Sequence, residues 1–549
     1  MREKLEKIIR NAADIDDSIP VIIEVPSRSE HGHFATNVAM TLASKKRLPP
    51  KKLAELIVKN IEDKEGIIEK IEIAGPGFIN FWINDRAWYK ALLEVLSSKE
   101  KYGSQDLGKG KKVIIEFVSA NPTGPLHIGH ARGAALGDSL SMIMDFLGYR
   151  VTREFYINDA GQQIRLLGES IYSRYKQLSE PDYPFPENGY HGEYITELAQ
   201  MISKETDLSS MPKEEAVRFC AERGKEIMLE QIKKDLEAFK VSFDTWFSEK
   251  SLYESGLLSK TLNELKNKGL LYEKDGAVWI RTSQFGDDKD RVLRKSDGQF
   301  TYFASDIAYH LDKKKRGFDQ AINIWGADHH GYIPRLKAAL VSQEFPEDWL
   351  RVLLIQLVKL WKEGKEVKMS KRSGEFITFR ELMEEVGVDA MRFVFLTKSH
   401  DSSLDFDIDL VKRQDAENPV YYVQYAHARI CSILRKAKER GISFRTPDIE
   451  ELSCLKLPEE IELIRNVVEF PYVLKEIALH LEPHRLTYYL TSLASIFHRY
   501  FNLGTSRPEL RVVSDDSALT NVRLALSEAV RVVIEKGLTL LGVSAPERM

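Results

Sequence analysis

The sequence predicts a multidomain protein in which a parallel-sheet α/β domain lies between an α+β amino-terminal domain and a helical carboxyl-terminal bundle. A chain of 549 residues is too long for a single hydrophobic core. A strand–helix–strand pattern begins at residue 113, and the pattern after about residue 380 is almost wholly helical. The composition, with 43% hydrophobic and 30% charged residues, is typical of a globular protein.

The amino-terminal domain is expected over residues 1–108, where helical and strand patterns alternate. Residues 1–10 form an amphipathic helix with acidic positions and no apolar run, so no signal peptide is indicated. Gly75-Pro76-Gly77 predicts a turn that leads into a strand over 78–83. The polar, glycine-containing segment 99–112 is the expected linker to the next domain.

The middle domain is expected over residues 109–380 and begins with a βαβ unit. Val113–Val118 is a β-branched and aromatic run of the kind that forms a buried parallel strand. Asn121–Pro125 ends the strand, apolar residues recur at helical spacing from His127 to Gly148, and residues 149–157 read as the second strand. In such a unit the helix amino-terminus lies at the carboxyl end of the strand and offers unpaired N–H groups to a phosphate.

The start of the predicted helix carries His127, Gly129 and His130. The two histidines lie one turn apart and can reach the same phosphate, and Gly129 lets a flat ligand approach the backbone. Taken alone, this short motif fits a helix cap with two incidental histidines equally well.

A second motif follows far downstream. Residues 351–360 predict a strand, Gly364 a turn and residues 366–368 the returning strand. Lys368 and Lys371 then lie on a polar loop, where isolated lysines are usually solvated surface charge. Downstream of a phosphate-binding helix start, they are suited to neutralising the charge that develops in phosphoryl transfer. The two motifs together indicate an enzyme that adenylylates a small acid.

The rest of the chain is organised more simply. A helical insertion is expected at about 165–290 within the middle domain, and a helical domain over 381–549. No apolar stretch is long enough to span a bilayer, so no membrane partner is expected. A reducing, cytoplasmic location without a structural zinc site is predicted because no CxxC pattern links the three cysteines, Cys220, Cys431 and Cys454.

The net charge of −4 does not by itself favour a nucleic-acid partner. Affinity for phosphate follows local patches, however, and basic clusters occur at residues 45–52, 313–316 and 435–440. Each of these clusters alone is more often a solvated face than a binding site.

Six blocks of sequence resemble arginyl-tRNA synthetases of class I. They lie at residues 119–125, 156–161, 302–309, 326–332, 421–429 and 545–549. The resemblance extends from one end of the chain to the other and includes both signature sequences of class I, with both lysines kept. Val388-Asp389-Ala390-Met391-Arg392 also resembles the DALR signature of anticodon-binding domains, with Met in place of Leu at similar volume.

This resemblance implies a Rossmann-type catalytic domain, an amino-terminal domain that contacts tRNA, and a helical anticodon-binding domain of DALR type. It implies that the chain attaches L-arginine to tRNA(Arg) in two steps. ATP, entering with Mg²⁺, converts arginine to arginyl-adenylate with release of pyrophosphate, and the arginyl group then moves to the 2′-hydroxyl of the terminal tRNA adenosine. Arginine activation is expected to need bound tRNA, and a monomer without a protein-bound metal is expected.

The resemblance also assigns residues to the nucleotide site. The expected ATP-binding residues are Pro125, His127, Gly129, His130, Gly326, Asp328, His329, Lys368, Met369, Ser370 and Lys371. Among them, the expected catalytic residues are His127, His130, Lys368 and Lys371. His329 and His330 would suit a metal by residue type, but without further ligands a metal site is not expected.

A pocket for arginine should present carboxylates to a planar guanidinium. Tyr302 and Asp306 are four residues apart in a helix-like segment and share a face, and Glu116 ends the first strand. From the pattern alone, Asp306 would more often be a helix cap or a surface ion pair. The resemblance implies instead that Glu116 and Asp306 hold the guanidinium, Tyr302 lines the pocket, and Asn121 helps to bind the α-amino group.

Four residues are expected to contact tRNA. Asn418-Pro419 marks the start of a helix that carries Tyr422, Tyr425 and Ala426. An exposed tyrosine there can stack on a base, although in most bundles it would belong to the core. The resemblance implies that these three residues, with the carboxyl-terminal Met549, contact the anticodon region.

Two other interpretations stay open. Cysteinyl-tRNA synthetases share both signatures and a similar helical tail, but they select their substrate with a cysteine-rich zinc pocket that this sequence lacks. The chain could also be a tRNA-binding relative that does not charge tRNA, or a nucleotidyltransferase acting on a small molecule. Intact signatures argue against a relative that does not charge tRNA. The helical tail would be unexplained in a small-molecule nucleotidyltransferase.

Overall fold

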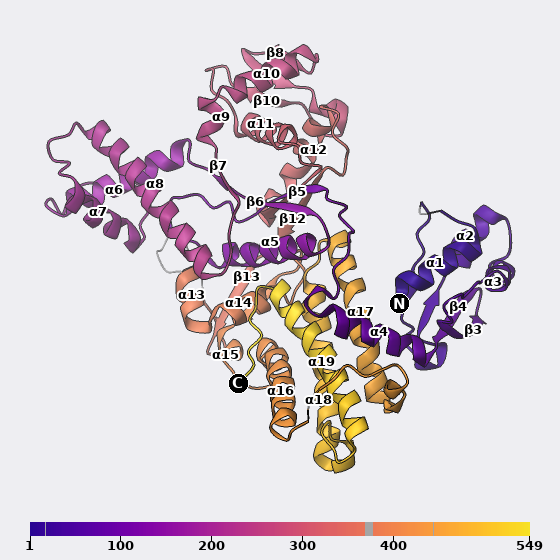
Figure 1. Cartoon of the computed structure of the whole chain (residues 1–549). Coiled ribbons are helices and arrows are strands. Elements are labelled where there is room, and N and C mark those ends of the chain that lie inside the picture. Colours follow the sequence, from indigo (N-terminus) through magenta and orange to yellow (C-terminus); the bar gives the residue numbers. More distant parts are fainter. Residues whose placement is uncertain (17, 368–376, 443) are drawn as a thin grey trace.

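The computed structural model describes residues 1–16, 18–367, 377–442 and 444–549. An amino-terminal part, a central sheet with two excursions and a set of long carboxyl-terminal helices can be followed along the chain (Figure 1). Among the described residues, no helix is long and apolar enough to cross a membrane.

The amino-terminal part is an antiparallel sheet with strand order β1-β2-β4-β3, against which helices pack. The strands are β1 (Ile23–Glu24), β2 (Phe34–Thr36), β3 (Ile68–Ala74) and β4 (Phe78–Ile83), and the helices are α1 (Arg2–Ala13), α2 (Val38–Lys46) and α3 (Pro50–Lys59). The expected turn between β3 and β4 is confirmed, because Gly75 and Gly77 adopt φ of 51° and 140°.

The central sheet is wholly parallel, with strand order β12-β11-β5-β6-β7. Its strands are β5 (Lys112–Glu116), β6 (Arg150–Ile157), β7 (Thr245–Ser248), β11 (Gln320–Gly326) and β12 (Leu350–Ile355), and α5 (Ile128–Phe146) joins β5 to β6. The predicted βαβ unit is therefore confirmed. The strand order reverses between β5 and β11, and ligands of such sheets bind at this point, beyond the carboxyl ends of the strands.

The expected helical insertion at 165–290 is only partly helical. It contains α6 (Gln162–Gln177), α7 (Glu193–Glu205), α8 (Lys213–Ala238), α9 (Lys250–Glu254) and α10 (Leu257–Asn267), but also β7 of the central sheet and the strands β8 (Leu271–Lys274) and β9 (Ala277–Ile280). These two strands form an antiparallel sheet with β10 (Arg291–Arg294), which directly follows the stretch. Strands of four residues are too short to show a period, and β7 forms because it pairs with β6.

The expected strand at 351–360 is two strands, β12 and β13 (Val358–Lys362). β13 turns back at Gly364, which adopts φ of 70°, into β14 (Lys365–Val367), so the predicted hairpin is confirmed. A third strand, β15 (Leu404–Asp407), pairs in parallel with β13 and comes from the region expected to be almost wholly helical. Of the remaining helices, α11 (Tyr302–Lys315) and α12 (Ile333–Val341) pack on each other, and α15 (Ile408–Val411) packs on β13. The others are α13 (Phe379–Val386) and α14 (Val388–Phe395), which pack on each other.

The carboxyl-terminal helices pack on one another and on the amino-terminal part. They are α16 (Pro419–Glu439), α17 (Pro458–His480), α18 (His484–Ser506) and α19 (Ser517–Leu540), and α4 (Asp85–Ser98) lies against α17 and α19. The Tyr102 hydroxyl donates to the carbonyl of Val467 at 3.3 Å, and Gln105 Nε2 donates to that of Pro471 at 3.0 Å. One continuous cluster of buried hydrophobic residues thus extends from the amino-terminal part to these helices.

Candidate functional site

The two histidines of the first signature lie together at the start of α5. His127 caps the helix, because its Nδ1 accepts from the Gly129 N–H at 3.1 Å, and His130 Nδ1 accepts from the His127 N–H at 3.2 Å. The two rings stack with centroids 3.7 Å apart and planes 20° apart. A Cβ on Gly129 would lie 3.0 Å from Cε1 of His127, so the glycine leaves room for the capping imidazole. Both imidazoles are therefore held beside a positive helix end, which favours a phosphate.

A second segment reaches the same edge of the sheet. Gly326 ends β11, the parallel neighbour of β5, and Asp328 and His329 follow it directly. Their side chains are exposed, and Asp328 Oδ2 lies 3.8 Å from His329 Nε2. Pro125 is half-buried in the loop before α5. These residues and the two histidines flank the reversal of strand order, where a nucleotide is expected.

The second signature, with Lys368, Met369, Ser370 and Lys371, lies outside the described residues. The described chain on both sides of it is informative. β14 ends at Val367, and Thr378 forms an antiparallel bridge with His127. The Phe379 N–H donates to the Leu126 carbonyl at 3.0 Å. The chain that follows the second signature is thus bonded directly to the first.

Two acids lie close together near the carboxyl ends of β6 and β7, Glu249 buried and Asp306 half-buried. Asp306 on α11 accepts from the Tyr332 hydroxyl, and burial, reinforced by the charge of Glu116, raises the pKa of the Asp306 carboxyl to about 7. Glu249 is 2% exposed, and burial, followed by the nearby charge of Asp306, raises the pKa of its carboxyl to about 7. Among the residues that the structure describes, neither acid takes part in a salt bridge. A cationic ligand would stabilise both in their ionised form.

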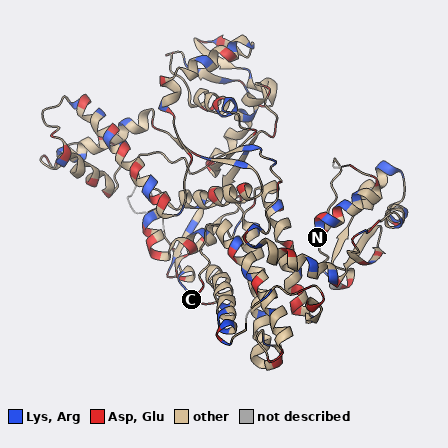
Figure 2. Ribbon diagram, in the orientation of Figure 1, with Lys and Arg blue, Asp and Glu red and all other residues tan. Residues whose placement is uncertain are grey.

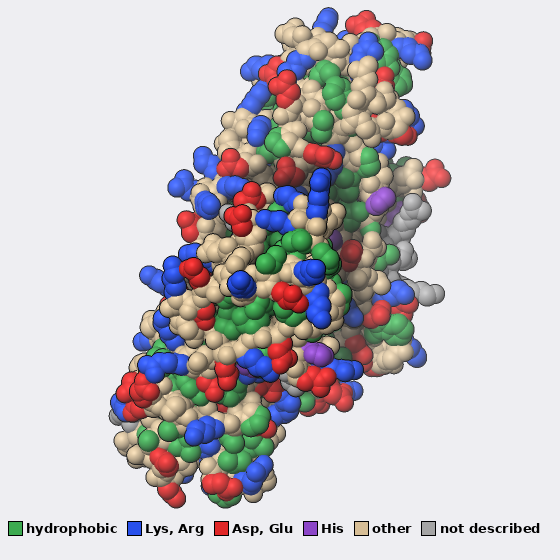
Figure 3. All heavy atoms as spheres, turned by 90° about the vertical axis from the view of Figure 1, so that its right-hand side faces the viewer, with side chains coloured by type: hydrophobic (Ala, Val, Ile, Leu, Met, Phe, Trp, Pro, Cys, Tyr) green, Lys and Arg blue, Asp and Glu red, His purple; other side chains and the backbone are tan. Residues whose placement is uncertain are grey.

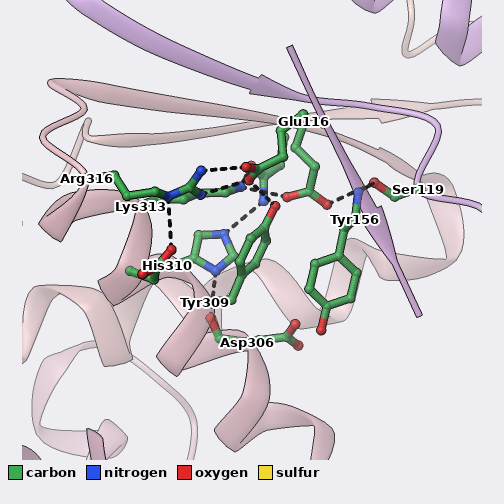
Figure 4. Close-up of polar contacts among 11 residues, drawn as sticks. Glu116, Ser119, Tyr156, Asp306, Tyr309, His310, Lys313 and Arg316 are labelled. Carbon is green, nitrogen blue, oxygen red and sulfur yellow. Dashed lines mark hydrogen bonds and ion pairs between the residues drawn. The ribbon is translucent and has the colours of Figure 1, made fainter. Parts of the chain in front are cut away.

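Glu116 is in a different situation from the one expected. Its Oε2 lies 2.7 Å from Nζ of Lys313, and its Oε1 accepts from the Ser119 hydroxyl at 3.3 Å (Figure 4). The acid predicted to hold a substrate guanidinium thus already has an internal cation. A carboxylate has about four acceptor positions, so these two contacts do not exhaust it.

The other two predicted pocket residues lie at the surface of the same region. Tyr302 is 62% exposed and begins α11, so it shares a helix face with Asp306 as predicted. Asn121 Nδ2 donates to Oε1 of Gln163 at 2.6 Å.

Glu249 was missed from the sequence. It directly follows β7, so it stands at the carboxyl end of a strand of the central sheet, as a ligand-binding residue should. The available signal was an acid after the aromatic pair Trp246-Phe247. The interpretation of residues 165–290 as helical concealed it.

The predicted RNA-contacting residues of α16 differ in exposure. The Tyr425 ring stacks on Tyr421, with centroids 5.8 Å apart, and the Arg429 guanidinium lies 4.5 Å from its centroid. The Tyr422 ring packs on His498 at 4.6 Å and is half-buried. Ala426 is fully buried, because α16 packs there against its neighbours, and its contact with RNA stays a prediction. The Met549 side chain is 51% exposed.

Only some of the basic clusters lie on the surface. In the cluster at 313–316, Lys313 is fully buried and Arg316 forms an ion pair with Glu154 at 2.6 Å, so these two residues do not form an RNA-binding face. Lysines and arginines do mark the end of α2 and the far end of α16 (Figure 2). The face that carries the amino-terminal part shows cationic, acidic and hydrophobic side chains intermixed (Figure 3).

A wholly parallel sheet, a histidine signature at its first helix, a lysine signature in the sequence after the β13–β14 hairpin and a helical tail together define a class I aminoacyl-tRNA synthetase. Family models agree along the chain: an arginyl-tRNA synthetase amino-terminal domain matches residues 1–83, a class I (R) tRNA synthetase catalytic domain residues 91–430, and a DALR anticodon-binding domain residues 423–549. The chain belongs to the arginyl-tRNA synthetase (arginine–tRNA ligase) family.

Individual relatives agree with this assignment. An arginine–tRNA ligase of Desulfosudis oleivorans is 50% identical over 562 residues, covering 100% of both chains. One from Geobacillus thermodenitrificans is 48% identical over 557 residues, covering 100% of this chain and 99% of that one. The solved structure of Thermus thermophilus arginyl-tRNA synthetase has the same fold, with a TM-score of 0.81 at 23% identity over 100% of both chains.

Proposed function

We propose that the chain attaches L-arginine to tRNA(Arg) in two steps, with Mg-ATP as the second substrate. The observation that carries the choice of arginine is the pair formed by the half-buried Asp306 and the buried Glu249, which have no salt bridge among the described residues. Arginine brings two cationic groups, the guanidinium and the α-ammonium. A buried charge is stable only when it is paired, so two uncompensated acids match this amino acid and not cysteine.

In the first step, the arginine carboxylate attacks the α-phosphorus of ATP, the bond to the bridging oxygen breaks, and pyrophosphate leaves. His127 and His130 stabilise the charge on the α-phosphate from the start of α5. Lys368 and Lys371 neutralise the departing pyrophosphate. In the second step, the 2′-hydroxyl of the terminal tRNA adenosine attacks the carbonyl of the adenylate, and AMP leaves. The protein contributes positioning and electrostatics rather than covalent chemistry.

The remaining site residues have binding roles in this proposal. The nucleotide is held by Pro125, Gly129, Gly326, Asp328, His329, Met369 and Ser370. Asp306 receives the guanidinium, with Tyr302 over it and Glu116 beside it, and Asn121 helps to hold the α-amino group. Tyr422, Tyr425 and Met549 contact the anticodon region of tRNA. The proposed monomer is checked by light scattering of the purified chain.

Charging of total tRNA with each of the twenty amino acids tests the proposal, together with pyrophosphate exchange with and without tRNA. Arginine alone should be charged, and exchange should depend on tRNA. Charging with another amino acid would keep the assignment to class I synthetases but refute the proposed roles of the arginine-pocket residues. Tight tRNA binding without any charging would make the chain an RNA-binding relative and refute the mechanism.

A further inference from the structure

Lys313 is a lysine buried completely beneath the arginine pocket. Its side chain is 0% exposed, and Nζ lies 2.7 Å from Glu116 Oε2, 3.1 Å from Asn323 Oδ1 and 4.2 Å from the centroid of the Tyr309 ring (Figure 4). Lysine is almost never fully buried unless it is paired. It stands near the end of α11, where a cation also interacts favourably with the helix dipole.

A directed chain of hydrogen bonds joins Lys313 to the helix turn that carries Asp306. His310 Nδ1 lies 2.7 Å from the Asp306 carbonyl, which can only accept, so Nδ1 carries the hydrogen. Burial, aided by the charge of Lys313, lowers the pKa of His310 to about 3, and the neutral ring then accepts from Asn323 Nδ2 at 2.9 Å. Asn323 Oδ1 is left to accept from Lys313. Each hydrogen bond along this chain therefore has one donor and one acceptor, without conflict between neighbours.

The charges around Glu116 divide into two sets. On the neighbouring strand, Glu154 is the register partner of Glu116, and Arg316 balances it at 2.6 Å. Lys313 balances Glu116 in the same way, so the two cations from the end of α11 neutralise the two acids on β5 and β6. The groups that face Glu116 from the elements packed on it are Glu154 and Tyr156 on β6, and Asp306, Tyr309 and Lys313 on α11.

We propose that Lys313 is a positioning residue for arginine recognition: its ion pair with Glu116 holds that carboxylate in place, and among the described residues it leaves Asp306 and Glu249 as the pocket acids without a salt bridge. Glu116 then offers its remaining acceptor positions to the guanidinium. The two acids without a salt bridge equal in number the cationic groups on arginine. This inference rests on the proposed function, and it adds a residue that does not touch the substrate.

The test is Lys313→Met, which removes the charge at similar length. The Glu116 carboxylate in this variant loses the ion pair that fixes it, so the guanidinium meets a misplaced acceptor. The KM for arginine should rise about tenfold, with the KM for ATP and the kcat at saturating arginine within about twofold. A residue that only stabilises the fold would lower the free energy of unfolding without this selective rise in the arginine KM.

Two further variants sharpen the test. Lys315→Met is the matched control, because Lys315 lies on the same turn but pairs with Glu264 at 2.7 Å on the surface, and it should leave the arginine KM unchanged. Lys313→Met/Glu116→Gln contains no unpaired buried charge and should fold. Because Lys313 acts through Glu116, the arginine KM of this double variant should equal that of Glu116→Gln alone within about twofold.

The outcomes separate the two proposals. A wild-type chain that does not charge arginine refutes the proposed function. A wild-type chain that does, together with a Lys313→Met variant of unchanged arginine KM, overturns only the role of Lys313. If the single variant does not fold, the double variant decides: an arginine KM several times that of Glu116→Gln, or failure to fold, overturns the inference.

Discussion

Arginine binding should weaken as the pH falls, because Asp306 and Glu249, which form no salt bridge among the described residues, must be ionised to receive it. The pKa of Asp306 and that of Glu249 are each raised to about 7, chiefly by burial. A bound cation favours the ionised forms, so the protonated fraction of the unliganded pocket opposes binding. The affinity for arginine is therefore highest above about pH 7 and falls as the pH drops below that value.

The magnitude follows from the same values. For one acid that must be ionised, the KM varies as the inverse of its ionised fraction, which changes about tenfold between about pH 8 and about pH 6. Two such acids would together change the KM by up to about a hundredfold. Neighbouring carboxyls titrate as a pair, so mutual repulsion separates their pKa values and makes the change in KM smaller. The expected rise in arginine KM over this range is therefore between about tenfold and about a hundredfold.

The assay is arginine-dependent pyrophosphate exchange at saturating ATP and tRNA, measured across this pH range. The KM for ATP serves as the internal control, because the acids are not part of the nucleotide site. The Asp306→Asn variant should bind arginine more weakly, and the pH dependence of its arginine KM should be reduced toward that expected for one titrating acid. An arginine KM that changes by less than about twofold, in wild-type protein whose ATP KM is steady, would refute the reasoning.

Three other changes have expected outcomes. Lys371→Ala should lower the kcat for adenylation far more than it raises the arginine KM, and steady-state kinetics showing equal losses would contradict a role in pyrophosphate departure. Arg392→Leu should destabilise the protein by about 3 kcal/mol, because the buried guanidinium bonds Asp138 at 2.6 Å and the Leu541 carbonyl at 2.9 Å. Denaturant unfolding checks this, and a loss as small as that of an exposed ion pair would contradict it. Tyr425→Ala should raise the KM for tRNA by about tenfold, corresponding to one lost base stack, while the pyrophosphate-exchange KM for arginine stays constant.

Much of the fold could be predicted because it is encoded locally. The β-branched run before Glu116, the helical spacing after His127 and the turn at Gly364 each specify their element through periodicity or backbone freedom, and the structure has all three. Short strands such as β7 and β15 could not be predicted, because they form only through pairing with strands distant in sequence.

The candidate site was predicted less completely, because charge alone does not reveal burial. Lys313 stood in a run of cations that read as a solvated face, yet it is buried against Glu116, a residue 197 positions away. Glu249 carried no motif, and only the folded sheet removes it from water. Ala426 fitted the RNA-contacting segment but packs inside the bundle.

The sequence by itself therefore determined the family, the order of the domains and the positions of both signatures, since these depend on residue identity along the chain. Only the tertiary structure decided which acids of the pocket are neutralised and which remain uncompensated. The physical reason is that a buried charge is set by the partner that the fold brings within hydrogen-bonding distance, and sequence separation does not limit which residue that partner is.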